Sequence, residues 1–139
     1  MLAIVDERVD ARCMTEAMNK QGCSVGTDGA PAPHRVTDMD HPAAPVEPNH
    51  RKCDYLFLAA EEGGPGVLVV PLELKSTKLN AASVVAQLQA GAGAAEQIVR
   101  GISTVRFVAV AVHGGKVHRR QYQELRKGGP VSATDVTRS

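Results

Sequence analysis

Two runs of strand-forming residues on either side of a short turn constrain the fold more than any other stretch. The runs are Cys53–Ala60, CDYLFLAA, and Val67–Ser76, VLVVPLELKS. The hexapeptide between them, EEGGPG, is rich in the residues that form turns. The pattern predicts an antiparallel β-hairpin whose second strand carries a glutamate and a lysine among apolar residues.

The register of this hairpin predicts that two carboxylates lie close together. Counting back from the turn along both strands brings Asp54 opposite Glu73. Residues directly opposite share a face with Cβ atoms roughly 5 Å apart, and Lys75 lies two residues further along that face. Lys75 could neutralise one carboxylate, but a divalent cation held by both suits the arrangement better. A bulge at Pro71 would shift the register by one residue and separate the pair.

Upstream of the hairpin, the sequence predicts one helix and one short strand. A spacing of four predicts an amphipathic helix over Val5–Asn19 that ends near Gly22, with its inner face formed by Val5, Val9, Cys13 and Ala17. The next segment, 26–50, contains five of the eight prolines, so it holds at most one short strand, around His34–Met39.

Downstream, a helix and a buried strand are expected. Asn80 is a suitable N-cap for a helix with an apolar face formed by Ala81, Val84, Val85, Leu88, Ala92 and Ala95. The run STVRFVAVAVHGG, 103–115, predicts a buried strand, and HRRQYQELRKGG, 118–129, a short basic helix. We therefore expect one domain over 1–128 and a disordered tail over 129–139.

Composition limits the classes to which the chain can belong. The 139 residues suffice for one domain with a sizeable core, and no run reaches the ~18 apolar residues of a membrane span. The N-terminus turns acidic too early for a signal peptide, and the three cysteines match no common zinc spacing. A cytoplasmic protein with free, buried cysteines fits these features best.

The ordered residues around the hairpin resemble a known family. Asp54, then eighteen residues, then Glu73-Leu74-Lys75, followed by a helix carrying Gln87, is similar to the core of the PD-(D/E)xK nuclease superfamily. The resemblance covers Glu16 to about Val112, and Cys53 stands where the name-giving pattern has proline. It implies an α/β protein with the restriction-endonuclease-like αβββαβ core, a mixed sheet flanked by helices.

The resemblance also implies an activity and a role for each motif residue. Asp54, Glu73 and the backbone carbonyl of Leu74 would hold Mg²⁺ or Mn²⁺, which polarises the scissile phosphate and activates a water molecule. Lys75 would orient that water and stabilise the developing negative charge, and Gln87 would position the water or the metal shell. The implied function is metal-dependent hydrolysis of phosphodiester bonds by a nuclease, with DNA favoured over RNA.

Two assignments within the resemblance stay open. The family often has an acidic residue on its first helix, for which Glu16 is the first candidate and Glu7 the second. Gln89 is the alternative to Gln87 for the glutamine of the helix that follows the motif. Endonuclease or exonuclease action and a homodimer or larger assembly also stay open.

Charge is distributed unevenly along the chain. Residues 100–139 contain eight Lys and Arg against two Asp and Glu, whereas residues 1–50 contain four against eight. Lys116, Arg119 and Arg120 are therefore the candidates for contacts with nucleic-acid phosphates. The alternative for these residues is a solvated helix face.

Three other interpretations compete with a nuclease site. The Asp54, Glu73 and Lys75 side chains could form a cross-strand salt bridge on an exposed face, worth about 0–1 kcal/mol. A nuclease fold without catalysis could bind nucleic acid or a protein partner. The third is a Zn²⁺ or iron–sulfur site, with ligands from Cys13, Cys23, Cys53, His34, His41 and His50.

Overall fold

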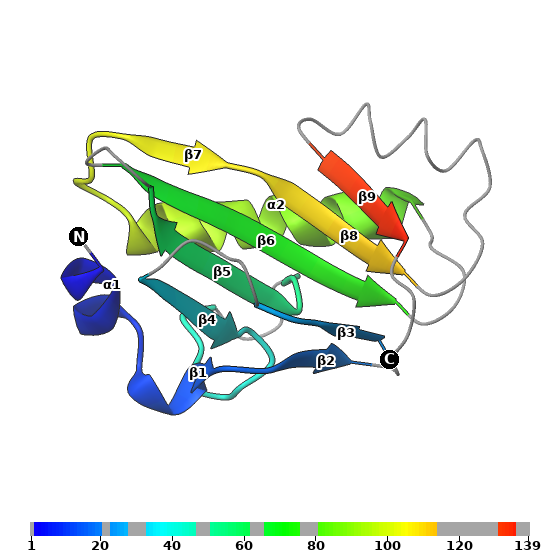
Figure 1. Cartoon of the computed structure of the whole chain (residues 1–139), viewed down its shortest axis with the longest axis horizontal. Helices are drawn as coiled ribbons and strands as arrows, with labels where there is room; N and C mark the ends of the chain where they lie inside the picture. Colours follow the sequence, from blue (N-terminus) through cyan, green and yellow to red (C-terminus); the bar gives the residue numbers. More distant parts are fainter. Residues whose placement is uncertain are drawn as a thin grey trace.

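The computed structural model describes residues 2–20, 23–27, 33–46, 51–61, 66–75, 81–113 and 131–135 of the chain (Figure 1). Its helical elements are α1 (Ala3–Arg8), the single 3₁₀ turn η1 (Ala11–Cys13) and α2 (Ala81–Ile98). The strands are β1 (Met14–Thr15), β2 (Met18–Lys20), β3 (Cys23–Val25), β4 (His34–Asp38), β5 (Tyr55–Ala60), β6 (Val67–Lys75), β7 (Val105–Phe107), β8 (Ala109–His113) and β9 (Val131–Asp135).

Within these residues a seven-stranded mixed sheet forms the centre of the molecule. Its order is β1-β4-β5-β6-β8-β9, with β7 also paired to β6. In the part of the sheet ordered β1-β4-β5-β6, neighbouring strands are antiparallel. In the other part, β7 and β8 run parallel to β6, and β9 runs parallel to β8. The chain is thus a mixed α/β protein with few helices, and β2 and β3 form a separate two-stranded ribbon.

The predicted hairpin and its register are confirmed. Ala60 pairs with Val67, and the pairing continues without a bulge to Tyr55 opposite Leu72. Pro71 lies in register opposite Leu56, so it does not displace the residues beyond it. The predicted short strand near His34–Met39 is also present, as β4.

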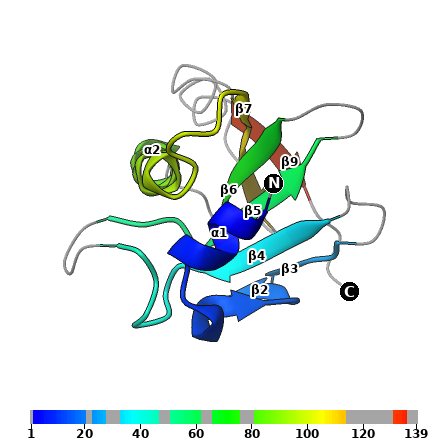
Figure 2. The ribbon, with the colours of Figure 1, turned by 90° about the vertical axis from the view of Figure 1, so that its left-hand side faces the viewer.

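The two faces of the sheet have different covers, as Figure 2 shows. Helix α2 lies against one face, and α1 lies beside its C-terminal end. The core there contains Leu2, Val5, Val9, Leu56, Leu58, Val67, Val69, Ala95 and Ile98. The β2–β3 ribbon lies on the other face, over a core that includes Met18, Cys23, Val36, Tyr55, Phe57, Leu72, Leu74 and Val112.

Helix α2 is held close to the sheet at its middle and at its C-terminal end. A Cβ atom added to Gly91 would lie 2.4 Å from Cys53 Sγ and 3.2 Å from Pro71 Cβ, so only glycine fits at this contact. At the end of the helix, Arg8 Nη1 donates to the carbonyl oxygens of Ile98 (2.9 Å) and Arg100 (2.6 Å). The bond to Ile98 satisfies a carbonyl group that α2 leaves without a partner in its last turn, and the bond to Arg100 fixes the chain just beyond the helix.

The predicted helix over Val5–Asn19 is wrong beyond Arg8. The chain becomes extended at Val9, and the Asp10 side chain then accepts a hydrogen bond from the Arg12 backbone N–H at 2.9 Å, which fixes the turn of η1. The following residues pair with β4 as β1. Val9 is buried as the spacing predicted, but a strand edge and an Asp-capped turn compete successfully with the weak helical preference of this segment.

The predicted disordered tail over 129–139 also differs from the structure. Residues Val131–Asp135 form β9, which pairs along its whole length with β8. The β-branched Val131 and Thr134 favour an extended backbone, and the free side of β8 supplies the hydrogen-bonding partner that local sequence cannot reveal. The predicted N-cap Asn80 and the predicted basic helix over 118–129 lie outside the described residues.

Candidate active site

Glu73 lies near the end of β6 on the face that α2 covers. Its neighbours Leu72 and Leu74 point to the opposite face, where they join the core under the β2–β3 ribbon. The side chain of Glu73 is fully buried. Among the described residues, Thr37 and Glu73 are the buried polar side chains, so an ionisable group in this position requires specific partners.

Lys75 and Gln87 surround one oxygen of the Glu73 carboxylate. Lys75 Nζ lies 3.5 Å from Glu73 Oε2, which shows that the two side chains share a face as the alternation predicted. Gln87, with its amide nitrogen towards the carboxylate, donates to the same oxygen at 3.2 Å and to the Ser83 carbonyl at 3.3 Å. The other oxygen, Oε1, is buried and has no hydrogen-bond partner among the described residues.

Asp54 approaches the same end of β6 from the strand that precedes the turn. Its backbone N–H donates to the Leu72 carbonyl at 3.0 Å, and its Oδ2 accepts the Leu74 N–H at 2.7 Å. The N–H and C=O groups of one extended residue point to the same neighbouring strand. The Leu74 carbonyl therefore lies on the Asp54 side of β6, as the proposed ligand set requires.

Burial and nearby negative charges disfavour the charged forms of the two carboxyl groups. Burial, together with the Asp54 charge, raises the pKa of Glu73 to about 7, although Lys75 and a hydrogen bond from the Asp54 backbone act in the opposite direction. Burial also raises the pKa of Asp54, while the hydrogen bond from Leu74 lowers it. The site thus concentrates negative charge for which Lys75 compensates only in part.

A hard divalent cation fits this arrangement. Mg²⁺ binds through one or two carboxylates and keeps several water ligands, so Asp54, Glu73 and the Leu74 carbonyl form a suitable set. The unpartnered Glu73 Oε1 is a free ligand atom in a place where an unpaired polar atom otherwise costs about 1–3 kcal/mol. Within the described part of the chain, no group of three His, Cys, Asp or Glu side chains could hold a metal, so a cation here depends on the backbone carbonyl and water.

Gly91 accounts for the position of Gln87. The contact of Gly91 with Cys53 and Pro71 holds the helix against the two strands of the hairpin. Gln87 lies one helical turn earlier on the same side of α2, because residues four apart share a helix face. The close approach therefore brings its amide within reach of Glu73. Gln89, the alternative in the sequence, is exposed.

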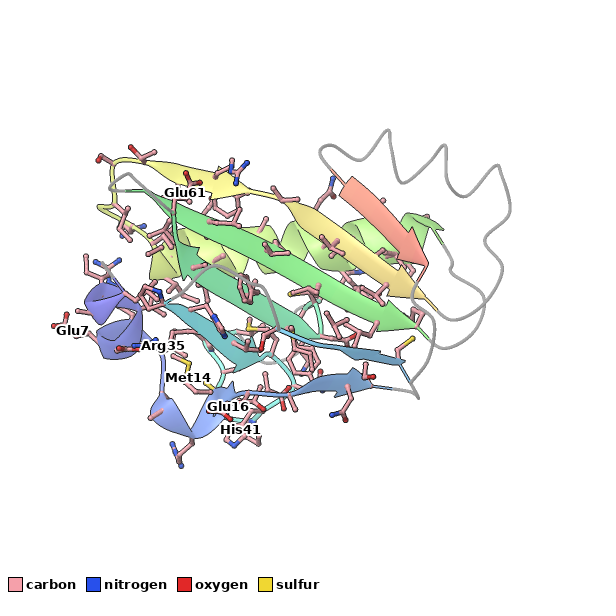
Figure 3. The ribbon with its side chains drawn as sticks, viewed as in Figure 1. Glu7, Met14, Glu16, Arg35, His41 and Glu61 are labelled. Carbon is pink, nitrogen blue, oxygen red and sulfur yellow. The ribbon has the colours of Figure 1, made fainter. Side chains whose placement is uncertain are left out.

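The candidate accessory acids do not lie on the expected helix. Glu16 follows β1 and is exposed, and it lines a hollow of about 450 Å³ together with His34 and Val36. Because Val36 pairs with Phe57 and His34 with Ala59, three and five residues from Asp54, this hollow lies roughly 10–17 Å along the strand from Asp54. Glu7 is exposed on α1, and Figure 3 shows it at the opposite end of the molecule from the arrowhead of β6.

The remaining candidate residues are the cysteines, the histidines and the basic residues near the C-terminus. Cys13, Cys23 and Cys53 are free and buried, as predicted. Burial, reinforced by the charge of Glu73, raises the pKa of Cys53 to about 12, so this thiol stays protonated. His50 and the candidate phosphate contacts Lys116, Arg119 and Arg120 lie outside the described residues.

Sequence reasoning missed a second charged group beside Asp54. Lys20 at the end of β2 forms ion pairs with Asp38 and Asp40 at the end of β4. The Met39 N–H between these two aspartates donates to the Asp54 carbonyl at 3.0 Å. A signal was available, since antiparallel pairing of the predicted strand near His34–Met39 with the hairpin would bring its C-terminal end to Asp54.

Comparisons of the chain with protein-family models, with curated proteins and with solved structures give no match. None of the helices that the structure describes is long and apolar enough to cross a bilayer.

Proposed function

We propose that the protein is a metal-dependent nuclease that hydrolyses phosphodiester bonds, with DNA as the favoured substrate. The observation that carries this proposal is the buried Glu73, which has Lys75 and Gln87 on one carboxylate oxygen and nothing described on the other. A salt bridge on an exposed sheet face would not be fully buried and would not leave an oxygen without a partner. The resemblance to the PD-(D/E)xK nucleases supports the same conclusion from the order of the residues.

The two carboxylates serve as ligands in this proposal. Asp54, Glu73 and the Leu74 carbonyl hold Mg²⁺ or Mn²⁺, which when bound polarises the phosphate and lowers the pKa of a water ligand. The hydrogen bond from the Leu74 N–H holds one oxygen of Asp54 in place. Burial keeps Glu73 away from bulk water, so few water molecules compete with its Oε1 as ligands of a cation.

Lys75 and Gln87 act on the nucleophile and the phosphate. The Lys75 ammonium group is partly exposed, at 26% of its side chain, so it can reach solvent or substrate from its place beside Glu73. It orients the attacking water and stabilises the negative charge that develops on the phosphate oxygens. Gln87 fixes the Glu73 carboxylate by an amide hydrogen bond to Oε2, and Oε1 has no hydrogen-bond partner among the described residues.

The test is cleavage of single- and double-stranded DNA and RNA with Mg²⁺, with Mn²⁺ and with EDTA. We expect cleavage that requires the metal and that falls at least about 100-fold in Asp54→Asn, Glu73→Gln and Lys75→Ala. Glu96→Gln is the matched control, because Glu96 is an exposed carboxylate on α2. Its activity should equal that of the wild type.

Two results would reject the proposal. Cleavage that persists in EDTA, or that is indifferent to Glu73→Gln and Lys75→Ala, would place the activity elsewhere. Tight binding of nucleic acid without cleavage under any condition would favour a non-catalytic module with this fold.

A further inference from the structure

Lys20 is a cation held in a fixed position beside the proposed active site. Its Nζ donates to Asp38 Oδ1 at 3.2 Å and forms a second, shorter contact with Asp40. The same ammonium group lies 5.1 Å from the centre of the Tyr55 ring, which adds a favourable cation–π contact. The side chain is 22% exposed, so it is confined but still accessible.

The β2–β3 ribbon that carries Lys20 is attached to the residues of the site. The Tyr55 hydroxyl donates to the Asn19 carbonyl at 3.1 Å and accepts the Asn19 N–H at 3.2 Å. On the neighbouring strand, the Cys23 thiol donates to the Lys75 carbonyl at 3.1 Å. Figure 1 shows the ribbon beside the C-terminal end of β6. The ribbon is therefore fixed to a residue adjacent to Asp54 and to Lys75 itself.

The aspartates that hold Lys20 are attached to Asp54 through the backbone. The Met39 N–H, between Asp38 and Asp40, donates to the Asp54 carbonyl oxygen at 3.0 Å. Lys75 comes from β6, beside Glu73, whereas Lys20 comes from β2 on the opposite face of the sheet. Two ammonium groups from different elements thus lie at this end of the hairpin, Lys75 beside Glu73 and Lys20 beside Tyr55, the residue that follows Asp54.

We propose that Lys20 is a second phosphate-binding cation of this site, and that it holds the nucleic-acid backbone at a phosphate next to the scissile one. This inference rests on the proposed nuclease function. An ammonium group has three N–H donors, and Asp38 and Asp40 account for two of them. The remaining donor and the partial exposure suit one phosphate oxygen, and the two aspartates hold the ammonium group in place.

Lys52 provides a matched control. Its Nζ lies 3.6 Å from Asp40 Oδ1, but its side chain is 41% exposed. Removing this charge also takes one ion-pair partner from Asp40. It does not remove a cation that contacts Asp38 and the Tyr55 ring.

The experiment measures binding of a short DNA duplex as a function of salt, in the Glu73→Gln background, in which the duplex stays intact. A single phosphate contact contributes about 0.9 to the slope of log K against log salt concentration. Lys20→Met should reduce the slope by about that amount and weaken binding about tenfold near 0.1 M salt. Lys20→Arg and Lys52→Met should keep the parent slope.

A second pair of variants covers the case in which Lys20→Met destabilises the ribbon. Asp40→Asn leaves Lys20 with one fewer carboxylate to compete with a phosphate, so it should tighten binding several-fold. If Lys20 only supports the structure of the ribbon, Asp40→Asn should not tighten DNA binding. The gain should disappear when Asp40→Asn is combined with Lys20→Met, which removes the cation, and it should persist when Asp40→Asn is combined with Lys20→Arg, which keeps the charge.

The outcomes separate this inference from the nuclease proposal. An unchanged slope in Lys20→Met, or no gain in Asp40→Asn, overturns the role of Lys20 while metal-dependent cleavage by the wild type still stands. Failure of the parent to bind any duplex also overturns it. The nuclease proposal is then decided separately, by testing whether the wild-type protein cleaves single- or double-stranded DNA or RNA.

Discussion

Glu73 is a carboxylic acid placed where its charged form is unfavourable. Burial and the neighbouring Asp54 raise its pKa to about 7, against an ordinary value of 4.5. Between these two pH values the folded chain binds a proton that the unfolded chain has lost. The free energy of unfolding therefore falls as the pH rises from about 4.5 to 7, and the whole loss is present above pH 7.

Glu73→Gln should remove this pH dependence, because a neutral amide has no charge to bury. The shift corresponds to a loss on the order of 3 kcal/mol in the wild type above pH 7. We expect the variant to be more stable than the wild type at pH 8, with the advantage largely gone at pH 4.5. Urea unfolding at both pH values measures this, with Glu96→Gln as an exposed control. Equal differences at the two pH values would show that folding does not raise the pKa of Glu73.

Residue by residue, the sequence predicted part of the site. Strand alternation predicted that Glu73 and Lys75 share a face, and the family resemblance, not the spacing of the helix, pointed to Gln87, which lies beside Glu73. Lys20 and Asp40 were missed because their approach depends on the β2–β3 ribbon. The residues of β2 fall inside a segment with helical spacing, so the sequence pattern concealed the ribbon.

At the scale of elements, the hairpin was predictable because its turn fixes its register. A six-residue loop and alternating apolar residues leave one pairing that buries both strands. The first helix was not predictable to the same degree. Its spacing of four correctly marks Val5, Val9 and Cys13 as buried, but a short helix, a 3₁₀ turn and a strand edge can bury the same residues.

The two glycines of α2 offer a test of how closely the helix must approach the hairpin. Gly91→Ala would drive a methyl group into Cys53, so we expect a loss of about 1–3 kcal/mol in the free energy of unfolding. Gly93 has nothing within 4 Å of an added Cβ, so Gly93→Ala should stabilise the protein by about 0.5–1 kcal/mol through helix propensity. Chemical denaturation of both variants measures the difference. A similar gain from both substitutions would mean that α2 lies further from Cys53.

In the molecule as a whole, the sheet combines an antiparallel half with a parallel half. The pairing in the antiparallel half, β1-β4-β5-β6, follows from local turns and from the alternation of side chains. The parallel half depends on partners distant in sequence, since β8 lies between β6 and β9. Local patterns indicate that 103–115 is extended, but they do not indicate which strand pairs with its outer side. The misassignment of Val131–Asp135, within the tail predicted over 129–139, is the consequence.

Truncation tests whether β9 belongs to the folded sheet. Ending the chain before Val131 removes five residues that pair with Ala109–His113 and leaves β8 as an edge. We expect a loss on the order of 2 kcal/mol in the free energy of unfolding, because backbone hydrogen bonds of β8 revert to solvent. Ending the chain after Asp135 retains all of β9 and, if β9 is the part of this segment that stabilises the sheet, should leave stability unchanged. If both truncations match the full chain in thermal unfolding, β9 contributes nothing, and the sheet that supports Glu73 ends at β8.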